Sequence, residues 1–274
     1  MTDTFDRSCD HWSESARGEM EHFYTLATVD YRYLAESRNW AQWFLERQNP
    51  GRTLRLLDVA CGSGKFPRAL AAHADLAGVA DVNYALLDPS PFSIAETKRV
   101  LPPPFIAGAE YEETLQDLSA PAGAFDVVWA THALYALPAS ELELGMKKFA
   151  EAISPGGSGF IAHSTATGHY VAFYRDFLAD FRNGTPYTSA EQIVEALSGL
   201  GVNFSTEVIE YTNGAPLEEY GVIEGYLQRC AFDDSVSLEQ MLDAPTTGKR
   251  LAEARGSDAW AFKQQVMLIS IDGP

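Results

Sequence analysis

Cysteine is scarce in this chain, and its spacing excludes two common ways of stabilising a small protein. The three cysteines, Cys9, Cys61 and Cys230, form neither a C-x-x-C pair nor a Cys/His cluster. An odd number of cysteines at such spacings predicts neither a disulfide framework nor a zinc site. We therefore expect no bound metal and interpret the thiols as small buried hydrophobic groups.

Basic residues are also few. Lys and Arg number 20 against 38 Asp and Glu, which gives a formal net charge of −18. Nucleic acids and anionic membranes attract clusters of Lys and Arg, so this balance argues against both as partners. The sequence shows neither an apolar run long enough to cross a bilayer nor a secretion leader. We predict a cytoplasmic protein, and the sequence leaves monomer and homodimer open.

Apolar runs alternate with helical segments along most of the chain. With 46% hydrophobic and 21% charged residues, the composition is that of a folded globular protein. The alternation is typical of βα units around a mostly parallel sheet, and it predicts an α/β, Rossmann-like, doubly wound fold. The expected strands are 54–60, 84–88, 105–108, 125–130, 159–163, 203–211 and 265–271, and the expected helices are 65–73, 91–101, 141–153, 169–181, 190–200 and 217–230.

The first 50 residues precede this pattern and predict a helical lid. Residues 10–47 read as two helices, while residues 51–274 are expected to form the main domain, with an insert at about 183–256. The aromatic rings of the two helices either cover a flat ligand or pack the helices together, and both interpretations stay open. These rings belong to Trp12, Phe23, Tyr24, Tyr31, Tyr33, Trp40, Trp43 and Phe44.

Local signals mark the ends of several elements. Thr188 followed by Glu191 fits a capping box for the helix 190–200, and Ser90 is placed to cap the helix that starts at Pro91. The stretch 154–157, which reads Ser-Pro-Gly-Gly, predicts a turn between a helix and the next strand.

The strongest chemical signal is a buried strand that runs into a small-residue turn, Leu57-Asp58-Val59-Ala60-Cys61-Gly62-Ser63-Gly64, followed by a helix. Gly62 and Gly64 let the backbone approach a ligand closely. The free N–H groups at the start of the helix favour an electronegative partner. The position of the glycines between strand and helix therefore predicts a ligand-binding loop.

Asp88 ends the next predicted strand, 24 residues after Gly64. In Rossmann-type folds an acid at this place accepts hydrogen bonds from both hydroxyls of a ribose. Two cofactor classes share this arrangement. A dinucleotide fingerprint requires a third glycine where this chain has Pro67, and no Tyr-x-x-x-Lys relay occurs, so both observations favour S-adenosylmethionine (SAM) over a nicotinamide dinucleotide.

Together, four motifs resemble the successive motifs of class I SAM-dependent methyltransferases: the glycine loop, Leu87-Asp88, Phe125-Asp126-Val127-Val128 and Pro155-Gly156-Gly157. The resemblance implies a seven-stranded sheet whose last strand, 265–271, is antiparallel, and SAM as cofactor in the domain 51–274. It also implies that Glu110, Tyr111 and Glu112 lie near the adenine and that Thr131 and His132 lie beside the reacting centre. The residues assigned to the cofactor are Asp58, Ala60, Gly62, Gly64, Asp88, Pro89, Ser93, Tyr111, Glu112 and Thr131.

A closer resemblance is to histamine N-methyltransferases, in the order and spacing of Asp88-Pro89-Ser90, Ile94-Ala95-Glu96-Thr97-Lys98, Leu134-Tyr135, Glu219-Tyr220-Gly221 and Phe232. The chain departs from that family at three positions. Ala60 and Cys61 stand where the family has glycines, and His132 stands where the family has a glutamine. The resemblance implies that Asp30 anchors an amine and that Gln264 supplies an amide near it.

Further residues are candidates for substrate contact. His132 directly follows the fourth predicted strand, where an ordinary imidazole could take a proton at neutral pH; a hydrogen-bonded pocket wall is the alternative. His163 ends the next strand and is a second pocket candidate. Tyr24, Tyr31 and Tyr135 could present ring faces to a substrate cation or simply pack.

These observations predict a SAM-dependent methyltransferase that acts on a small molecule, with N-methylation of an amine as the first interpretation. O- or C-methylation in specialised metabolism and non-catalytic SAM binding remain alternatives. Nucleobase methylation is disfavoured, because the turn 131–135 lacks the Asn/Asp-Pro-Pro-aromatic pattern. Radical chemistry is disfavoured because no C-x-x-x-C-x-x-C cluster occurs.

Overall fold

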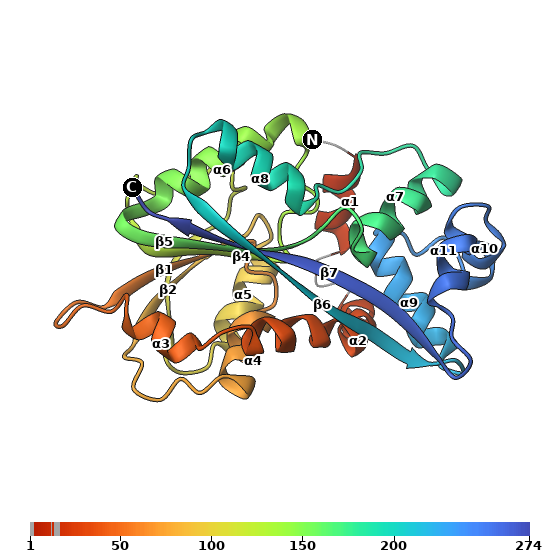
Figure 1. The fold of residues 1–274 in the computed structure, drawn as a ribbon, viewed down its shortest axis with the longest axis horizontal. Coiled ribbons are helices and arrows are strands. Elements are labelled where there is room, and N and C mark those ends of the chain that lie inside the picture. Colours follow the sequence, from red (N-terminus) through yellow and green to blue (C-terminus); the bar gives the residue numbers. More distant parts are fainter. Residues whose placement is uncertain (1–2, 12, 14–16) are drawn as a thin grey trace.

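A computed structural model describes residues 3–11, 13 and 17–274, and its centre is a twisted seven-stranded sheet (Figure 1). The strands lie in the order β3-β2-β1-β4-β5-β7-β6. All neighbours pair in parallel except β7, which is antiparallel to both β5 and β6. The expected fold class, with an antiparallel last strand, is therefore confirmed. The strands are β1 (Leu54–Val59), β2 (Val82–Leu87), β3 (Phe105–Tyr111), β4 (Phe125–Thr131), β5 (Ile153–Ser164), β6 (Phe204–Pro216) and β7 (Ala259–Asp272).

Helices precede, connect and follow the strands. Among the described residues, α2 (Arg17–Glu36) and α3 (Trp40–Leu45) lie in the range 10–47 where two helices were expected, and a further helix, α1 (Asp3–His11), precedes them. Trp12 lies outside the described residues. Two short helices inside the expected insert, α10 (Leu238–Asp243) and α11 (Thr247–Ala254), were not foreseen from the sequence. The remaining helices are α4 (Lys65–His73), α5 (Pro91–Val100), α6 (Ala139–Ala152), α7 (His169–Phe181), α8 (Ala190–Gly199) and α9 (Tyr220–Ala231).

Two local predictions were wrong by a small shift. The capping box of α8 uses Ser189 and Gln192, one residue later than expected, because the hydroxyl of Thr188 instead donates to the carbonyl of Leu137 at 2.6 Å. The stretch 154–157 is part of β5 rather than a free turn, and the pairing of β5 with β4 changes register there. Ser90 does cap α5, as expected, by accepting a hydrogen bond from the backbone of Ser93.

Two apolar cores cover the two faces of the sheet because side chains alternate along each strand. On one face Leu56 packs with Trp40, Phe66 and Trp129, under α2, α3 and α4. On the other face Leu57 packs against residues of α6 and α8, and Figure 1 shows these helices on the opposite side of the sheet. Fully burying one such side chain is worth roughly 1.5–3 kcal/mol, so these faces dominate the stability of the sheet.

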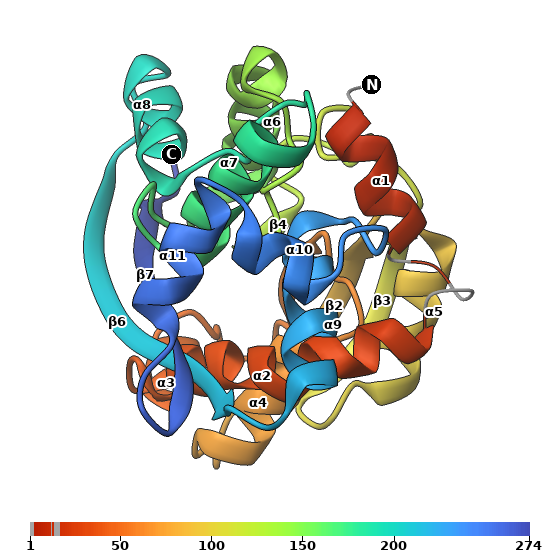
Figure 2. The same ribbon diagram turned by 90° about the vertical axis from the view of Figure 1, so that its right-hand side faces the viewer.

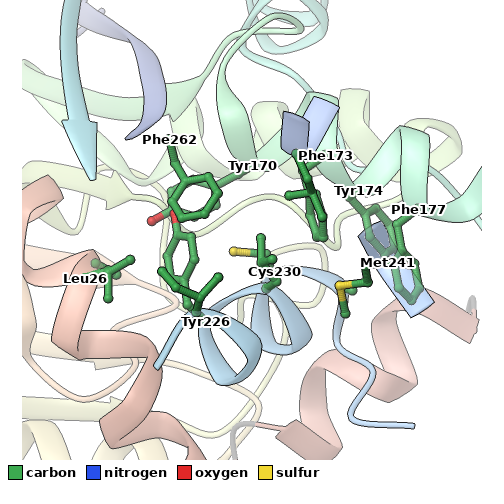
Figure 3. Packing of buried hydrophobic residues seen from close by; sticks show 14 of the residues in the cluster. Leu26, Tyr170, Phe173, Tyr174, Phe177, Tyr226, Cys230, Met241 and Phe262 are labelled. Atoms are coloured by element: carbon green, nitrogen blue, oxygen red, sulfur yellow. The ribbon is translucent and has the colours of Figure 1, made fainter. Parts of the chain in front are cut away.

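A third core lies beyond the carboxyl ends of the parallel strands. β6 and β7 continue past those ends as a long antiparallel ribbon (Figure 1). On this ribbon α7, α9 and α11 pack around Tyr170, Phe173, Tyr226 and Phe262, and Figure 3 shows these rings together with Cys230. This core places α9 next to α2, across the carboxyl edge of the sheet (Figure 2). No helix within the described ranges combines the length and the hydropathy that crossing a membrane requires.

Asp126 ties the opposite, amino-terminal edge of the sheet together. Its carboxylate accepts hydrogen bonds from the backbone N–H of Arg55 at 3.0 Å, from the guanidinium of Arg55 at 2.8 and 3.1 Å, from Arg52, and from the hydroxyl of Ser154 at 3.1 Å. Burial alone would raise the pKa of Asp126, but the bonds from Arg55 and Arg52 outweigh it and lower the pKa to about 2. Asp126 therefore joins β1, β4 and β5 rather than contributing to a ligand site.

We expect Asp126→Asn to lower the free energy of unfolding by about 1–2 kcal/mol at pH 7, a modest value because the arginines are half exposed. The lowered pKa means that the stabilisation is present above the ordinary value of 3.8 and is lost as the pH falls toward 2. The difference between wild type and variant in urea unfolding should therefore shrink on acidification. Asp81→Asn, at an exposed carboxylate, is the control. A difference that is constant from pH 7 to pH 2 contradicts this account.

Candidate active site

A cavity of about 210 Å³ lies at the carboxyl edge of the sheet, where β1, β2 and β4 end. The loops after these strands line one half of it. Helices α1, α2 and α9, which surround this edge in Figure 2, contribute residues to the other half, among them Phe5, Tyr24, Asp30 and Cys230. The cavity is therefore continuous from the glycine loop to the aromatic core beyond the sheet.

The loop after β1 turns sharply by using left-handed backbone conformations. Ala60, Gly62 and Gly64 have φ angles of 51°, 54° and 68°. A side chain on Gly64 would collide with α5, because its Cβ would lie 2.9 Å from Val100 and 3.2 Å from the backbone of Thr97. A Cβ on Gly62 would meet nothing closer than the carbonyl of Ala60 at 4.0 Å. Gly64 thus serves packing, whereas Gly62 leaves open space at the cavity wall.

Asp88 fastens this loop to the end of β2. Its carboxylate accepts hydrogen bonds from the backbone N–H groups of Gly62 at 3.0 Å and Ser90 at 2.9 Å. Burial raises the pKa of Asp88 to about 6, although these bonds favour the charged form. Because Asp88 also lines the cavity, its remaining lone pairs are available to the hydroxyl groups of a bound ribose.

Asp58 lies deeper in the same wall, near the end of β1. Its carboxylate accepts a 2.7 Å hydrogen bond from the hydroxyl of Tyr84, and its side chain is buried. Burial raises the pKa of Asp58 to about 7. A buried carboxylate with one hydrogen bond is best satisfied by a positively charged partner, such as the ammonium group of an amino acid.

His132 follows β4 in a conformation that is unusual for a residue with a side chain, with φ at 53°. Its Nδ1 lies 2.7 Å from the hydroxyl of Tyr135, and its Nε2 lies 3.4 Å from the hydroxyl of Tyr211. Burial, with a smaller effect of His163, lowers the pKa of His132 to about 3. The expectation of an ordinary imidazole pKa at this position was therefore wrong: His132 stays neutral at pH 7.

Asp30 lies on α2 in the wall of the cavity and is almost completely buried. Its carboxylate accepts hydrogen bonds from the hydroxyl of Tyr170 at 2.5 Å and from the amide of Asn213 at 2.9 Å. Burial raises the pKa of Asp30 to about 7. The ring of Tyr31 lies next to it and meets the ring of His132 edge-on, with the centroids 5.9 Å apart. This part of the cavity is an aromatic chamber with a carboxylate in its wall.

The structure brings most of the residues singled out from the sequence to this cavity, although their roles remain predictions. Gly64 instead packs on α5, and His163 stands behind Tyr135 with the ring centroids 4.1 Å apart. Gln264 is buried on β7 and donates to the hydroxyl of Tyr226 at 3.3 Å. Of the residues singled out from the sequence, those that line the cavity are Tyr24, Asp30, Tyr31, Asp58, Ala60, Gly62, Asp88, Pro89, Ser93, Thr131, His132 and Tyr135.

Tyr111 and Glu112 do not reach the cavity. β3 still pairs with β2 at Tyr111, whose ring packs edge-on against Phe125, and the lining begins after the chain has turned, at residues 113–116. Glu110 forms an ion pair with Lys98 instead. After β3 the cavity is thus lined by residues later in the chain than the sequence analysis expected, because the strand extends further than the sequence indicated.

Sequence reasoning missed the residues that surround Asp30. Tyr170 could have been found, because it lies in the first turn of the helix that follows β5 and so at the same edge of the sheet. Asn213 and Tyr211 gave no local signal, because only the pairing of β6 with β7 carries them there. In the part of the chain that the structure describes, no three His, Cys, Asp or Glu side chains are grouped so as to hold a metal ion.

Comparison with known proteins agrees with this geometry. Residues 57–158 match the model of a protein family described as a methyltransferase domain. A search of curated proteins finds no match. The matched domain and the fold together indicate a SAM-dependent methyltransferase, and the matched range spans the loop with Gly62, Asp88 and His132.

Solved structures with a similar fold share little sequence with this chain. A magnesium protoporphyrin IX methyltransferase from Synechocystis, with bound S-adenosylhomocysteine, is 12% identical, with 99% of this chain and 100% of that chain covered and a TM-score of 0.58. A putative methyltransferase from Bacillus halodurans is 12% identical, with 85% of this chain and 98% of that chain covered and a TM-score of 0.55. A possible histamine N-methyltransferase from Thermotoga maritima is 11% identical, with 96% of this chain and 99% of that chain covered and a TM-score of 0.51. These likenesses establish the fold.

We expect Asp88→Ala to weaken the binding of SAM or S-adenosylhomocysteine by about 2 kcal/mol or more, because a carboxylate that accepts from two hydroxyls makes strong, charge-assisted bonds. Isothermal titration calorimetry measures the loss, and Asp81→Ala at an exposed acid is the control. Unchanged affinity in the Asp88 variant would remove this carboxylate from the cofactor site.

The two glycines of the loop allow a matched comparison. Both valine variants carry the strain of a left-handed conformation, roughly 1–3 kcal/mol. Gly64→Val adds a collision with α5, so we expect it to lower the melting temperature more than Gly62→Val does. Gly62→Val should leave the fold largely intact and abolish cofactor binding, because its side chain would occupy space that the ligand needs. Normal SAM binding by Gly62→Val would show that the loop does not hold the cofactor.

Proposed function

We propose that this methyltransferase transfers the methyl group of SAM to the nitrogen of a small amine. Asp88, Asp58 and the loop at Gly62 would hold the cofactor. When bound, SAM supplies an electrophilic methyl group on a positively charged sulfur. The chain's own residues then have to orient the acceptor in line with that methyl group and exclude water, and orientation alone can contribute about 7–11 kcal/mol to catalysis.

The observation that carries the assignment to an amine is the buried carboxylate of Asp30 in the aromatic chamber. Asp30 lines the cavity, and the rings of Tyr24, Tyr31 and Tyr170 line it as well. An ammonium group is attracted both by a desolvated carboxylate and by the faces of aromatic rings. A neutral phenol would gain only a hydrogen bond from Asp30, without the attraction between opposite charges, and a carboxylate substrate would be repelled.

The fold comparisons support a small-molecule acceptor. Two of the similar structures are described as a magnesium protoporphyrin IX methyltransferase and a possible histamine N-methyltransferase. The cavity of about 210 Å³ is compatible with a small acceptor and not with a folded macromolecule. The formal charge of −18 also disfavours nucleic acid.

A panel of amines, phenols, carboxylates and activated carbon acids tests this function, with saturating SAM and detection of methylated product by mass spectrometry. We expect methylation of amines only. Product from the other classes but not from amines would replace the proposal with O- or C-methylation. SAM binding without methylation of any acceptor would favour a non-catalytic role.

Asp30→Asn should raise the KM for the amine about tenfold or more and leave SAM affinity nearly unchanged, because a hydrogen bond to a charged group is worth about 1.5–3 kcal/mol. The carboxylate must be ionised to attract the ammonium group, so wild-type kcat/KM should rise with pH through about 7, the pKa of Asp30. Asp176→Asn, which removes a buried carboxylate paired with Arg250, is the matched control. An unchanged KM in Asp30→Asn argues against an amine anchored at this acid.

A further inference from the structure

We propose that Lys65 and Tyr24 hold the α-carboxylate of the cofactor, with the ammonium group of Lys65 as its ion-pair partner and the hydroxyl of Tyr24 as its hydrogen-bond donor. The inference deepens the cofactor site of the proposed function and does not depend on which acceptor is methylated. In that site Asp88 binds the ribose and Asp58 binds the ammonium group at the amino-acid end of SAM. The carboxylate on the same carbon as that ammonium group still needs a partner.

The lining of the cavity does not favour an anion. Its acidic residues are Asp30, Asp58, Asp88 and Glu113. Like charges repel each other more strongly in a partly desolvated site than in water. A ligand that carries a carboxylate therefore needs a positive charge beside that carboxylate. Among the described residues that line the cavity, the lysine and arginine side chains are those of Lys65 and Arg229.

Lys65 lies at the start of α4, directly after the glycine loop, and α4 packs against α2 (Figure 2). Its Nζ stands 3.9 Å from the centroid of the Tyr24 ring, so a cation–π contact holds the ammonium group of this half-buried residue at the cavity wall. No acidic residue occupies the first turn of α4, and the helix dipole disfavours a cation there. The charge of Lys65 therefore does not stabilise its own helix, whereas it would attract the carboxylate of a ligand.

Tyr24 supplies the hydrogen-bond donor. It is a buried residue of α2 that lines the cavity, and its hydroxyl oxygen accepts a hydrogen bond from the hydroxyl of Ser63 at 3.3 Å. Burial raises the pKa of Tyr24 to about 12, so the phenol keeps its own proton at pH 7. A phenol can accept one hydrogen bond and donate another. Tyr24 thus joins the glycine loop, through its hydroxyl, to the ammonium group that lies over its ring.

Arg229 is less suited to this role. It is a buried residue of α9, and its guanidinium lies 2.6 Å from Nδ1 of His11 and donates to the carbonyl of His11 at 2.8 Å. Arg229 therefore ties α9 to the end of α1. Lys65, by contrast, closes the short segment that also contains Asp58 and Gly62. Because the ammonium group and the carboxylate of an amino acid share one carbon, partners in one segment can bind them side by side.

Two ligands that differ only in the carboxylate test this subsite: S-adenosylhomocysteine and its decarboxylated analogue, S-adenosyl-3-thiopropylamine. In isothermal titration calorimetry with the full chain, Lys65→Met should raise the Kd for S-adenosylhomocysteine about tenfold or more, because a charge-assisted bond to the carboxylate is lost. The Kd for the analogue should stay nearly unchanged, because it has no carboxylate for Lys65 to bind. Tyr24→Phe, which keeps the ring under the ammonium group, should also weaken S-adenosylhomocysteine alone, by less than Lys65→Met does.

Lys249→Met, at an exposed lysine of α11, is the matched control and should change neither Kd. Asp58→Asn should weaken both ligands, because both keep the ammonium group. If Lys65→Met does not fold, Lys65→Gln replaces it, since it removes the same charge with a polar side chain. An unchanged Kd for S-adenosylhomocysteine in the folded variant, or equal weakening of both ligands, would overturn the subsite. Failure of the wild type to bind S-adenosylhomocysteine would refute the cofactor site itself.

Discussion

The structure depends on the antiparallel pairing of β6 with β7, which continues from Phe204 opposite Ile271 to Pro216 opposite Ala259, past the ends of the parallel strands. A two-stranded ribbon that leaves its sheet has to bury its faces elsewhere. This one does so against α7 and α9, around Tyr226 and Phe262 (Figure 3). The ribbon thereby supports the aromatic half of the cavity, next to the half that the parallel strands and their loops provide.

Buried carboxylates define the electrostatics of the cavity. Asp30, Asp58 and Asp88 all line it, and burial raises the pKa of each, to about 7, 7 and 6. A raised pKa means that each acid favours the fold in its protonated form and that this stabilisation is lost as the pH rises through the folded value. The ligand-free protein thus carries an electrostatic cost at pH 7. Cationic ligands can offset that cost, which suits a site for a sulfonium and an amine.

The same pattern separates two kinds of acid in this chain. Asp126 at the amino edge has arginine partners and a pKa lowered to about 2, so its contribution is structural and lasts at neutral pH. Asp30 has the hydroxyl of Tyr170 and the amide of Asn213 as partners, which bind a carboxylate without neutralising it. Environment rather than residue type therefore distinguishes the acid that holds the sheet from the acid that can bind or move a proton.

The sequence by itself determined the α/β fold, the glycine loop and the position of Asp88, because these depend on strand periodicity and on short segments that are contiguous in the chain. The resemblance to histamine N-methyltransferases pointed to Asp30, and the end of the fourth predicted strand pointed to His132. Only the tertiary structure decided what these residues do for each other. The depressed pKa of His132, its contact with Tyr211 and the hydrogen bonds from Tyr170 and Asn213 to Asp30 arise from residues far apart in the chain, which the β6–β7 pairing and α7 bring together. Burial and partner distance set a pKa, and neither is encoded within one segment.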